Sequence, residues 1–150
     1  MRFIGDYTAK TDAKGRVFLP APLRKVLEAE ECTTLVMRQD LFQPCLVLYP
    51  SSLWHEMLDE LDTRLNRWNS QHQQVKRQFV ADAEMVETDS NGRILINKRK
   101  MEFARITTDV RFLAVDDHIE LWDRQTLEQH LQQSEPSLGS DIQQLMGGTI

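Results

Sequence analysis

One five-residue pattern, D-x-x-G-R, occurs twice in this chain of 150 residues, as DAKGR at 12–16 and DSNGR at 89–93. Asp at the first position and Gly at the fourth favour a type I turn. The carboxylate accepts hydrogen bonds from nearby backbone N–H groups, and the glycine tolerates a positive φ. The pattern therefore predicts two tight β-hairpin tips, whose turns are held by four residues, Asp12 and Gly15, and Asp89 and Gly92.

The similarity between the two copies extends beyond the motif. A short apolar strand follows each arginine, and a helix is then predicted over 20–29 in the first half and 98–106 in the second. Two further strand candidates and a closing helix follow in both halves. Because the order strand, strand, helix, strand, strand, helix is predicted twice, we expect an α+β fold made of two equivalent repeats.

The closing helices and the segments around them set the expected domain limits. Ser51 or Ser52 can cap the first closing helix, and Asp123 the second. In the first, apolar residues at helical spacing predict one stripe packed against the rest of the chain or a neighbouring subunit; its members are Leu53, Trp54, Met57, Leu58, Leu61, Leu65 and Trp68. Residues 69–82 are expected to form a further helical link.

From Ser134 onward the sequence gains Ser, Gly and Pro and loses its periodicity, which is typical of a mobile tail. The expected organisation is a first repeat over 1–72, a second over 73–133 and a C-terminal tail over 134–150.

Charge is distributed unevenly along the chain. The net charge is -5, which alone disfavours a polyanionic partner. Residues 1–27, however, hold six basic and two acidic groups, and 73–111 hold eight and six, including Lys98, Arg99 and Lys100. Positive charge is therefore concentrated around both copies of the motif, where it favours contact with a phosphate backbone.

Arg16 and Arg93 stand just past the two predicted tips. The planar guanidinium suits phosphate oxygens or the O6 and N7 atoms of guanine, and β-ribbons can enter DNA grooves. Both arginines are therefore candidate nucleic-acid contacts. Further candidates for phosphate contact are Lys10, Lys14, Arg24 and Lys25. The alternative is that each arginine pairs with the aspartate of its own motif and only stabilises the turn.

The sequence lacks the usual signatures of an enzyme or a metal protein. No catalytic carboxylate pair, nucleophile elbow or phosphate-binding glycine loop occurs, and Asp116-Asp117 is read as a turn between two strands. Four histidines are scattered without metal-ligand spacing. Cys32 and Cys45 are expected to be buried, reduced thiols. We therefore expect no catalytic activity, no cofactor and no metal.

Location is also constrained. No apolar run approaches the roughly 20 residues that a membrane-spanning helix requires. The N-terminal residues show no secretory signal. A cytoplasmic location is therefore expected, and no membrane association.

Together these residues resemble the MraZ family of bacterial regulators over residues 1–133. The most specific marks are DAKGRVFLPAPLRKVL, PCLVLYP followed by a tryptophan, the second motif DSNGR, and IELWD. The resemblance implies two tandem SpoVT-AbrB-like repeats that form a swapped-hairpin β-barrel with flanking helices. It places the DNA-binding D-x-x-x-R motif of the family on Asp12 and Arg16, with Lys14 as the basic residue inside it, and again on Asp89 and Arg93.

The resemblance also implies a function. Family members assemble into homo-oligomeric rings, octamers or dodecamers, and bind direct repeats in the double-stranded promoter DNA of their own division and cell-wall gene cluster. A nucleoid-associated repressor is therefore expected. Two alternatives stay open at this point, an oligomeric scaffold that binds no DNA and an AbrB-type antitoxin that binds DNA with a toxin.

Overall fold

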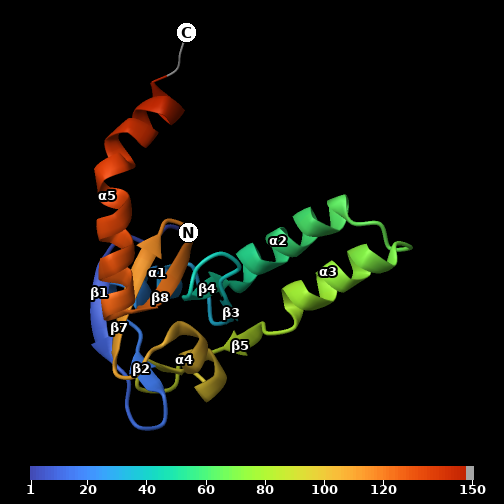
Figure 1. Cartoon of the computed structure of the whole chain (residues 1–150). Coiled ribbons are helices and arrows are strands. Elements are labelled where there is room, and N and C mark those ends of the chain that lie inside the picture. The colour runs from blue at the N-terminus through green and yellow to red at the C-terminus, as the bar shows by residue number, and fades with distance from the viewer. Residues whose placement is uncertain (148–150) are drawn as a thin grey trace.

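The computed structural model describes residues 1–147 (Figure 1). The first half contains β1 (Asp6–Lys10), β2 (Arg16–Phe18), α1 (Ala21–Ala29), β3 (Leu35–Gln39), β4 (Leu46–Pro50) and α2 (Ser51–Arg64). Helix α3 (Ser70–Val80) links it to β5 (Glu84–Val86), β6 (Arg93–Leu95), α4 (Lys98–Ala104), β7 (Asp109–Val115), β8 (His118–Asp123) and α5 (Arg124–Met146). The α+β class and the predicted element order are confirmed in both halves.

The two halves exchange strands. One antiparallel sheet has the order β1-β7-β8-β4-β3-β5, and β2 pairs with β6 in a separate two-stranded ribbon. Among residues 1–147, only β3 with β4 and β7 with β8 pair within one half. The pairs β1–β7, β3–β5, β4–β8 and β2–β6 each join one half to the other. Neither half therefore completes its sheet without the other.

The strand register reveals an approximate twofold relation between the halves. In the ribbon, Val17 pairs with Ile94, its counterpart one position after the motif arginine. In the main sheet, Val47 pairs with Glu120, and both stand one residue before a leucine-aromatic pair. A residue that faces its own counterpart across an antiparallel pair lies on a local twofold axis, so the β2–β6 and β4–β8 seams both lie near this axis.

The closed β-barrel expected from the resemblance is not formed. Within residues 1–147, β1 and β5 remain the two edges of the six-stranded sheet, and no ladder joins them. The ribbon does not bridge these edges, because β2 and β6 have three residues each and pair with one another. The sheet is therefore open, and the ribbon shares no strand pairing with it.

The main core lies between the ribbon, the inner face of the sheet and the two short helices. Val17 and Ile94 enter it from the ribbon, and Phe112 and Leu121 enter it from the sheet. Helix α1 contributes its two buried leucines, Leu23 and Leu27. A smaller cluster, Cys45, Trp122 and Leu127, packs where α5 begins.

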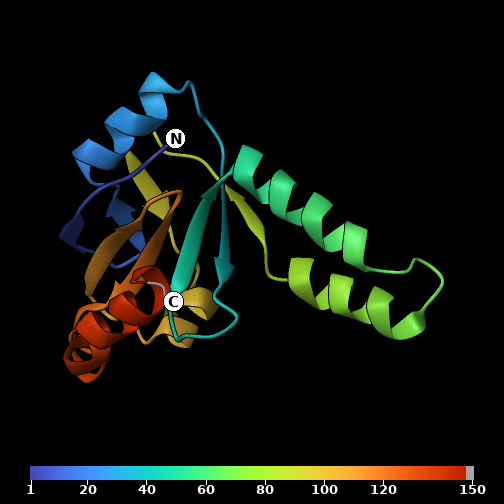
Figure 2. The ribbon, with the colours of Figure 1, turned by 90° about the horizontal axis from the view of Figure 1, so that it is seen from above.

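Helices α2 and α3 form an antiparallel pair that extends away from the body (Figures 1 and 2). The Trp54 ring stacks on the Phe79 ring at 5.2 Å, and Lys76 forms an ion pair with Asp62 at 2.8 Å. The expected stripe is interrupted, because α2 ends at Arg64 and the Trp68 side chain lies in the connecting loop, 91% exposed. Helical structure within 69–82 is confirmed.

The predicted caps differ between the two closing helices. The Asp123 side chain accepts hydrogen bonds from the Thr126 backbone N–H at 3.1 Å and from its hydroxyl at 2.8 Å, so this cap is confirmed. The prediction for the first closing helix is wrong. Pro50 precedes α2 without a side-chain cap, and Ser51 and Ser52 already lie inside the helix.

The segment 134–146 is helical rather than irregular. Helix α5 continues through Pro136 to Met146, and three of its serines form hydrogen bonds to carbonyls of the preceding turn. The Ser134 hydroxyl donates to the His130 carbonyl at 3.2 Å, and Ser137 and Ser140 each donate to a carbonyl three residues earlier. Residues 148–150 of the expected tail lie outside the described residues.

Among residues 1–147, no helix combines the length and the apolar character that crossing a bilayer requires.

Candidate nucleic-acid interface

The first D-x-x-G-R segment forms the predicted turn. Asp12 Oδ1 accepts hydrogen bonds from the backbone N–H groups of Lys14 and Arg16, both at 2.9 Å. Asp12 Oδ2 accepts from Arg16 Nε at 2.7 Å. The Gly15 N–H donates to the Asp12 carbonyl at 3.1 Å, and Gly15 has a φ of 85°. The aspartate therefore fixes both the turn and the direction of the guanidinium group.

The second segment repeats this geometry. Asp89 Oδ1 accepts from the backbone N–H groups of Asn91 and Arg93 at 2.9 Å, and Oδ2 accepts from Arg93 Nε at 2.9 Å. Gly92 has a φ of 83°. Two segments 77 positions apart thus form the same device, as the repeat predicts.

The turns are confirmed, but the hairpins are not. Beyond the pair formed by Asp12 and Arg16, the flanking strands separate: β1 pairs with β7, and β2 pairs with β6. The second turn behaves in the same way, because β5 pairs with β3. Each arginine therefore belongs to a ribbon shared between the halves.

Each turn also rests on the opposite half. The Ile96 N–H donates to the Gly15 carbonyl at 2.9 Å, and the Leu19 N–H donates to the Gly92 carbonyl at 3.0 Å. A Cβ atom on Gly15 would lie 2.4 Å from the Ile96 carbonyl oxygen. A Cβ atom on Gly92 would lie 2.0 Å from a terminal nitrogen of Arg24. A positive φ thus favours glycine at both positions, and the close approach to the Ile96 backbone adds a second requirement at Gly15.

The ribbon presents four side chains on its outer face, and we name this set the arginine ribbon face: Arg16, Phe18, Arg93 and Leu95. The alternate residues, Val17 and Ile94, are buried in the core. Arg16 pairs with Leu95, and Phe18 pairs with Arg93, so the arginines are diagonal neighbours. Such positions are about 7 to 8 Å apart. The structure therefore brings together two arginines that are distant in the sequence.

Pairing with aspartate leaves most of each guanidinium available. The contact in each turn uses Nε, so the terminal nitrogens keep four N–H donors. The Arg16 side chain is 36% exposed and the Arg93 side chain 23%. Arg93 also lies over the Phe18 ring, 6.0 Å from its centroid. An ion pair with the motif aspartate is thus compatible with binding a ligand.

The other basic candidates occupy different environments. Lys10 and Lys14 are exposed, at the end of β1 and in the first turn, whereas Arg24 is half-buried against the second turn. Lys100 is not available, although it lies in the basic segment after Arg93. It occupies the position equivalent to the buried Leu23, and its ammonium group contacts Glu84 at 2.7 Å and the Asp82 carbonyl at 2.6 Å.

Hydrogen bonds to the motif carboxylates affect their protonation. The Arg16 backbone N–H is the main reason that the pKa of Asp12 lies below the ordinary 3.8, and the Arg93 backbone N–H has the same effect on the pKa of Asp89. A lowered pKa in the folded state means that the ionised carboxylate stabilises the turn above pH 3.8. This stabilisation is lost as the pH falls through the lowered pKa.

Carboxyl-carbon NMR titration of the folded protein checks this effect. We expect the midpoints of Asp12 and Asp89 to lie below 3.8, because backbone donors favour the ionised form. Asp12→Asn and Asp89→Asn each assign one signal and serve as controls. A midpoint at or above 3.8 for either residue would contradict the turn geometry.

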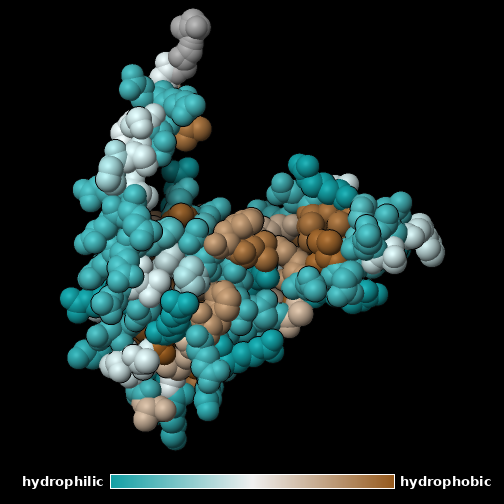
Figure 3. All heavy atoms as spheres, viewed as in Figure 1, coloured by the Kyte–Doolittle hydropathy of each residue, from teal (hydrophilic) through white to brown (hydrophobic). Residues whose placement is uncertain are grey.

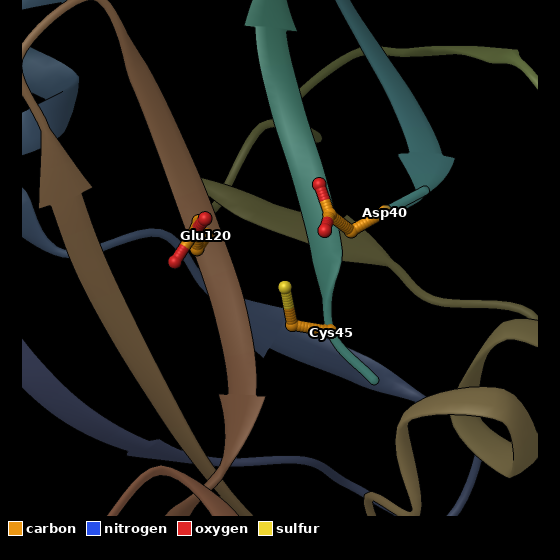
Figure 4. A group of neighbouring side chains, drawn as sticks. All are labelled: Asp40, Cys45 and Glu120. Atoms are coloured by element: carbon orange, nitrogen blue, oxygen red, sulfur yellow. The ribbon is translucent and has the colours of Figure 1, made fainter. Parts of the chain in front are cut away.

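The structure also contains a cluster of potential metal-ligating side chains that the sequence spacing did not predict. Asp40, Cys45 and Glu120 each offer a potential metal-ligating atom, and these atoms lie within 4.8 Å of one another (Figure 4). Both cysteines are free thiols, and Cys45 is buried as expected, but Cys32 is only half-buried. The predicted turn at Asp116-Asp117 is confirmed between β7 and β8.

Comparisons with known proteins agree with these features. The family model described as "MraZ protein, putative antitoxin-like" matches residues 2–78 and again 79–146. Among the relatives, a protein named transcriptional regulator MraZ from Phocaeicola vulgatus is 49% identical over 98% of this chain and 95% of its own length. A protein of the same name from Bacteroides thetaiotaomicron is 49% identical over 97% of this chain and 93% of its own.

A more distant relative from Flavobacterium psychrophilum, also named transcriptional regulator MraZ, is 33% identical over 96% of this chain and 91% of its own length. The two family matches meet between residues 78 and 79, near the C-terminal end of α3. The chain therefore belongs to the MraZ family.

Proposed function

We propose that this chain is a cytoplasmic, sequence-specific DNA-binding transcriptional regulator that contacts DNA through the arginine ribbon face. The observation that carries the proposal is that two arginines lie on one face of a two-stranded ribbon, each directed by an aspartate. The relatives named as transcriptional regulators support the same conclusion. A B-DNA major groove about 12 Å wide admits a two-stranded ribbon.

The roles follow from the geometry. Arg16 and Arg93 contact base edges or phosphates with their terminal N–H groups, because Nε is held by the aspartates. Asp12 and Asp89, with Gly15 and Gly92, hold the turns that position them. Exposed Lys10 and Lys14 supply phosphate contacts, and Arg24 does so from beside the second turn. The repeats over 1–72 and 73–133 thus each provide half of one DNA-binding surface.

We also propose that the protein acts as a homo-oligomeric ring on direct repeats in its own promoter, where it represses its division and cell-wall gene cluster. Apolar surface over α2 and α3, visible in Figure 3, supports self-association. Further apolar side chains remain exposed on the single chain, among them Ile4, Phe42 and Met85. A ring would let many weak contacts act together, because each later contact becomes intramolecular.

Binding to the promoter DNA over a salt series tests the proposal. We expect tight binding to the upstream DNA, weaker binding to a shuffled duplex of equal composition, and a linear fall of log K with log salt. Light scattering at the same protein concentrations reports the subunit number. Absent or salt-insensitive binding by an oligomer would favour the scaffold, and binding only with a partner toxin would favour the antitoxin.

Substitutions of Lys100 and Lys14 compare the effect of a buried charge on DNA binding with that of an exposed charge. Because the Lys100 ammonium group is held by Glu84 and the Asp82 carbonyl, Lys100→Met should change promoter affinity less than twofold. Lys14→Met removes an exposed charge beside Arg16 and should lower the salt slope by about 1. Fluorescence anisotropy of labelled DNA measures both. A large affinity loss in a folded Lys100→Met protein would show that this charge reaches the DNA.

A further inference from the structure

The cluster of Asp40, Cys45 and Glu120 lies on the sheet, away from the arginine ribbon face. Asp40 follows β3, Cys45 directly precedes β4, and Glu120 lies in β8, so the three residues come from both halves of the chain. Figure 4 shows the Cys45 sulfur directed toward the space between the two carboxylates. The potential ligand atoms lie within 4.8 Å of one another, so small side-chain movements toward a common centre would let them bind one ion.

The thiol of Cys45 is buried and has no partner. Its side chain is 0% exposed, and no hydrogen bond to Sγ is formed by any residue in the described range 1–147. The other cysteine differs, because Cys32 Sγ donates to the Thr34 carbonyl at 3.4 Å. Cys45 Sγ is thus a buried thiol that points toward two carboxylates and forms no hydrogen bond with either of them.

The carboxylates are held in place by hydrogen bonds that leave one oxygen of each available. Asp40 Oδ2 accepts from the backbone N–H groups of Phe42 at 3.0 Å and Gln43 at 2.9 Å. Glu120 Oε1 accepts from Trp122 Nε1 at 2.9 Å. Within the described part of the chain, Asp40 Oδ1 and Glu120 Oε2 have no hydrogen bond. Outer hydrogen bonds of this kind orient ligands in metal sites.

The electrostatics of the cluster favour a cation. Neither Asp40 nor Glu120 forms an ion pair with any lysine, arginine or histidine that the structure describes. A bound dication would compensate both carboxylates and stabilise the thiolate, with release of one proton on binding.

We propose that Asp40, Cys45 and Glu120 form a binding site for a divalent transition metal, with zinc as the ion best suited to one thiolate and two carboxylates. Zinc accepts sulfur and oxygen ligands together, whereas magnesium and calcium require oxygen alone. Three protein ligands leave one position for water. The ion would join the β3–β4 loop to β8 across the seam between the halves.

Zinc titration of the metal-free full chain by calorimetry tests the proposal. We expect one zinc ion per chain, and a loss of affinity of at least tenfold in Cys45→Ala. Cys32→Ala is the matched control, because it removes the other thiol outside the cluster, and it should bind as the wild type does. Asp40→Asn and Glu120→Gln should each weaken binding about tenfold or more. Circular dichroism without metal verifies that each variant is folded.

Cobalt substitution gives an independent result. Cobalt in the site should produce a thiolate-to-cobalt charge-transfer band that is present in Cys32→Ala and absent in Cys45→Ala. Zinc should also raise the Tm of the wild type more than that of Glu120→Gln at the same zinc concentration, since binding to the native state alone stabilises it. Absence of stoichiometric zinc binding, or wild-type affinity in folded Cys45→Ala and Glu120→Gln proteins, would overturn the proposal.

Discussion

Arg16→Ala is expected to weaken binding to promoter DNA by about 1 to 3 kcal/mol, or roughly 5- to 150-fold in Kd, if Arg16 makes a bidentate base contact. The loss arises because the terminal N–H groups of Arg16, directed by Asp12, have no replacement at that position. Arg93→Ala should have an effect of the same size, since its turn has the same geometry. Fluorescence anisotropy at fixed salt measures both.

The control for Arg16 is Arg124→Ala. Arg124 is an exposed arginine on α5, paired with Glu128 and outside the ribbon, so its removal gives the same change in net charge. It should leave Kd within about twofold. The type of contact is then read from specificity: loss of a base contact relaxes discrimination at one position, whereas loss of a phosphate contact weakens all duplexes equally. Equal affinity of wild type and a folded Arg16→Ala protein would remove Arg16 from the interface.

The turns, which depend on interactions between residues close in the sequence, were predicted correctly, whereas features that depend on partners in the other half were not. Asp12 and Gly15 form hydrogen bonds within five residues, so the local pattern is sufficient to predict the turn. The partner of the strand that follows lies in the other half. The same pattern therefore suggested hairpins, whereas the chain forms a ribbon with β6. Barrel closure likewise depends on the edges β1 and β5, which no local motif specifies.

Residues whose role depends on a distant partner were the most difficult to predict. Lys100 belongs to a run of three basic residues, which suggests an exposed side chain. It nevertheless occupies a buried helix position, because Glu84 and the Asp82 carbonyl bind its ammonium group. Glu120 lies far from Asp40 and Cys45 in the chain, so no ligand spacing revealed that cluster. By contrast, the equivalent positions of Arg16 and Arg93 on the ribbon could be predicted from the whole repeat, whereas their contact with DNA stays a prediction.

Gly15→Ala and Gly92→Ala test how far the contacts of each turn with the opposite half of the chain determine stability. The two glycines have nearly equal φ values, 85° and 83°, so the backbone cost of alanine, about 1 to 2 kcal/mol, should be the same. The steric costs differ. At Gly15 the new methyl group would meet the Ile96 carbonyl oxygen, whereas at Gly92 it would meet the end of the Arg24 side chain. The Arg24 side chain can rotate away, whereas the Ile96 carbonyl is fixed beside the first turn by the bond between the Ile96 N–H and the Gly15 carbonyl.

We therefore expect Gly15→Ala to lower the free energy of unfolding by about 2 to 5 kcal/mol, since overpacking adds about 1 to 3 kcal/mol to the φ cost. Gly92→Ala should cost only about 1 to 2 kcal/mol, and each variant is the control for the other. Urea denaturation at neutral pH measures both. Equal destabilisation would contradict this difference in packing. The expected order requires that a methyl group at Gly15 meets the backbone of the second repeat, whereas a methyl group at Gly92 meets a movable arginine of the first.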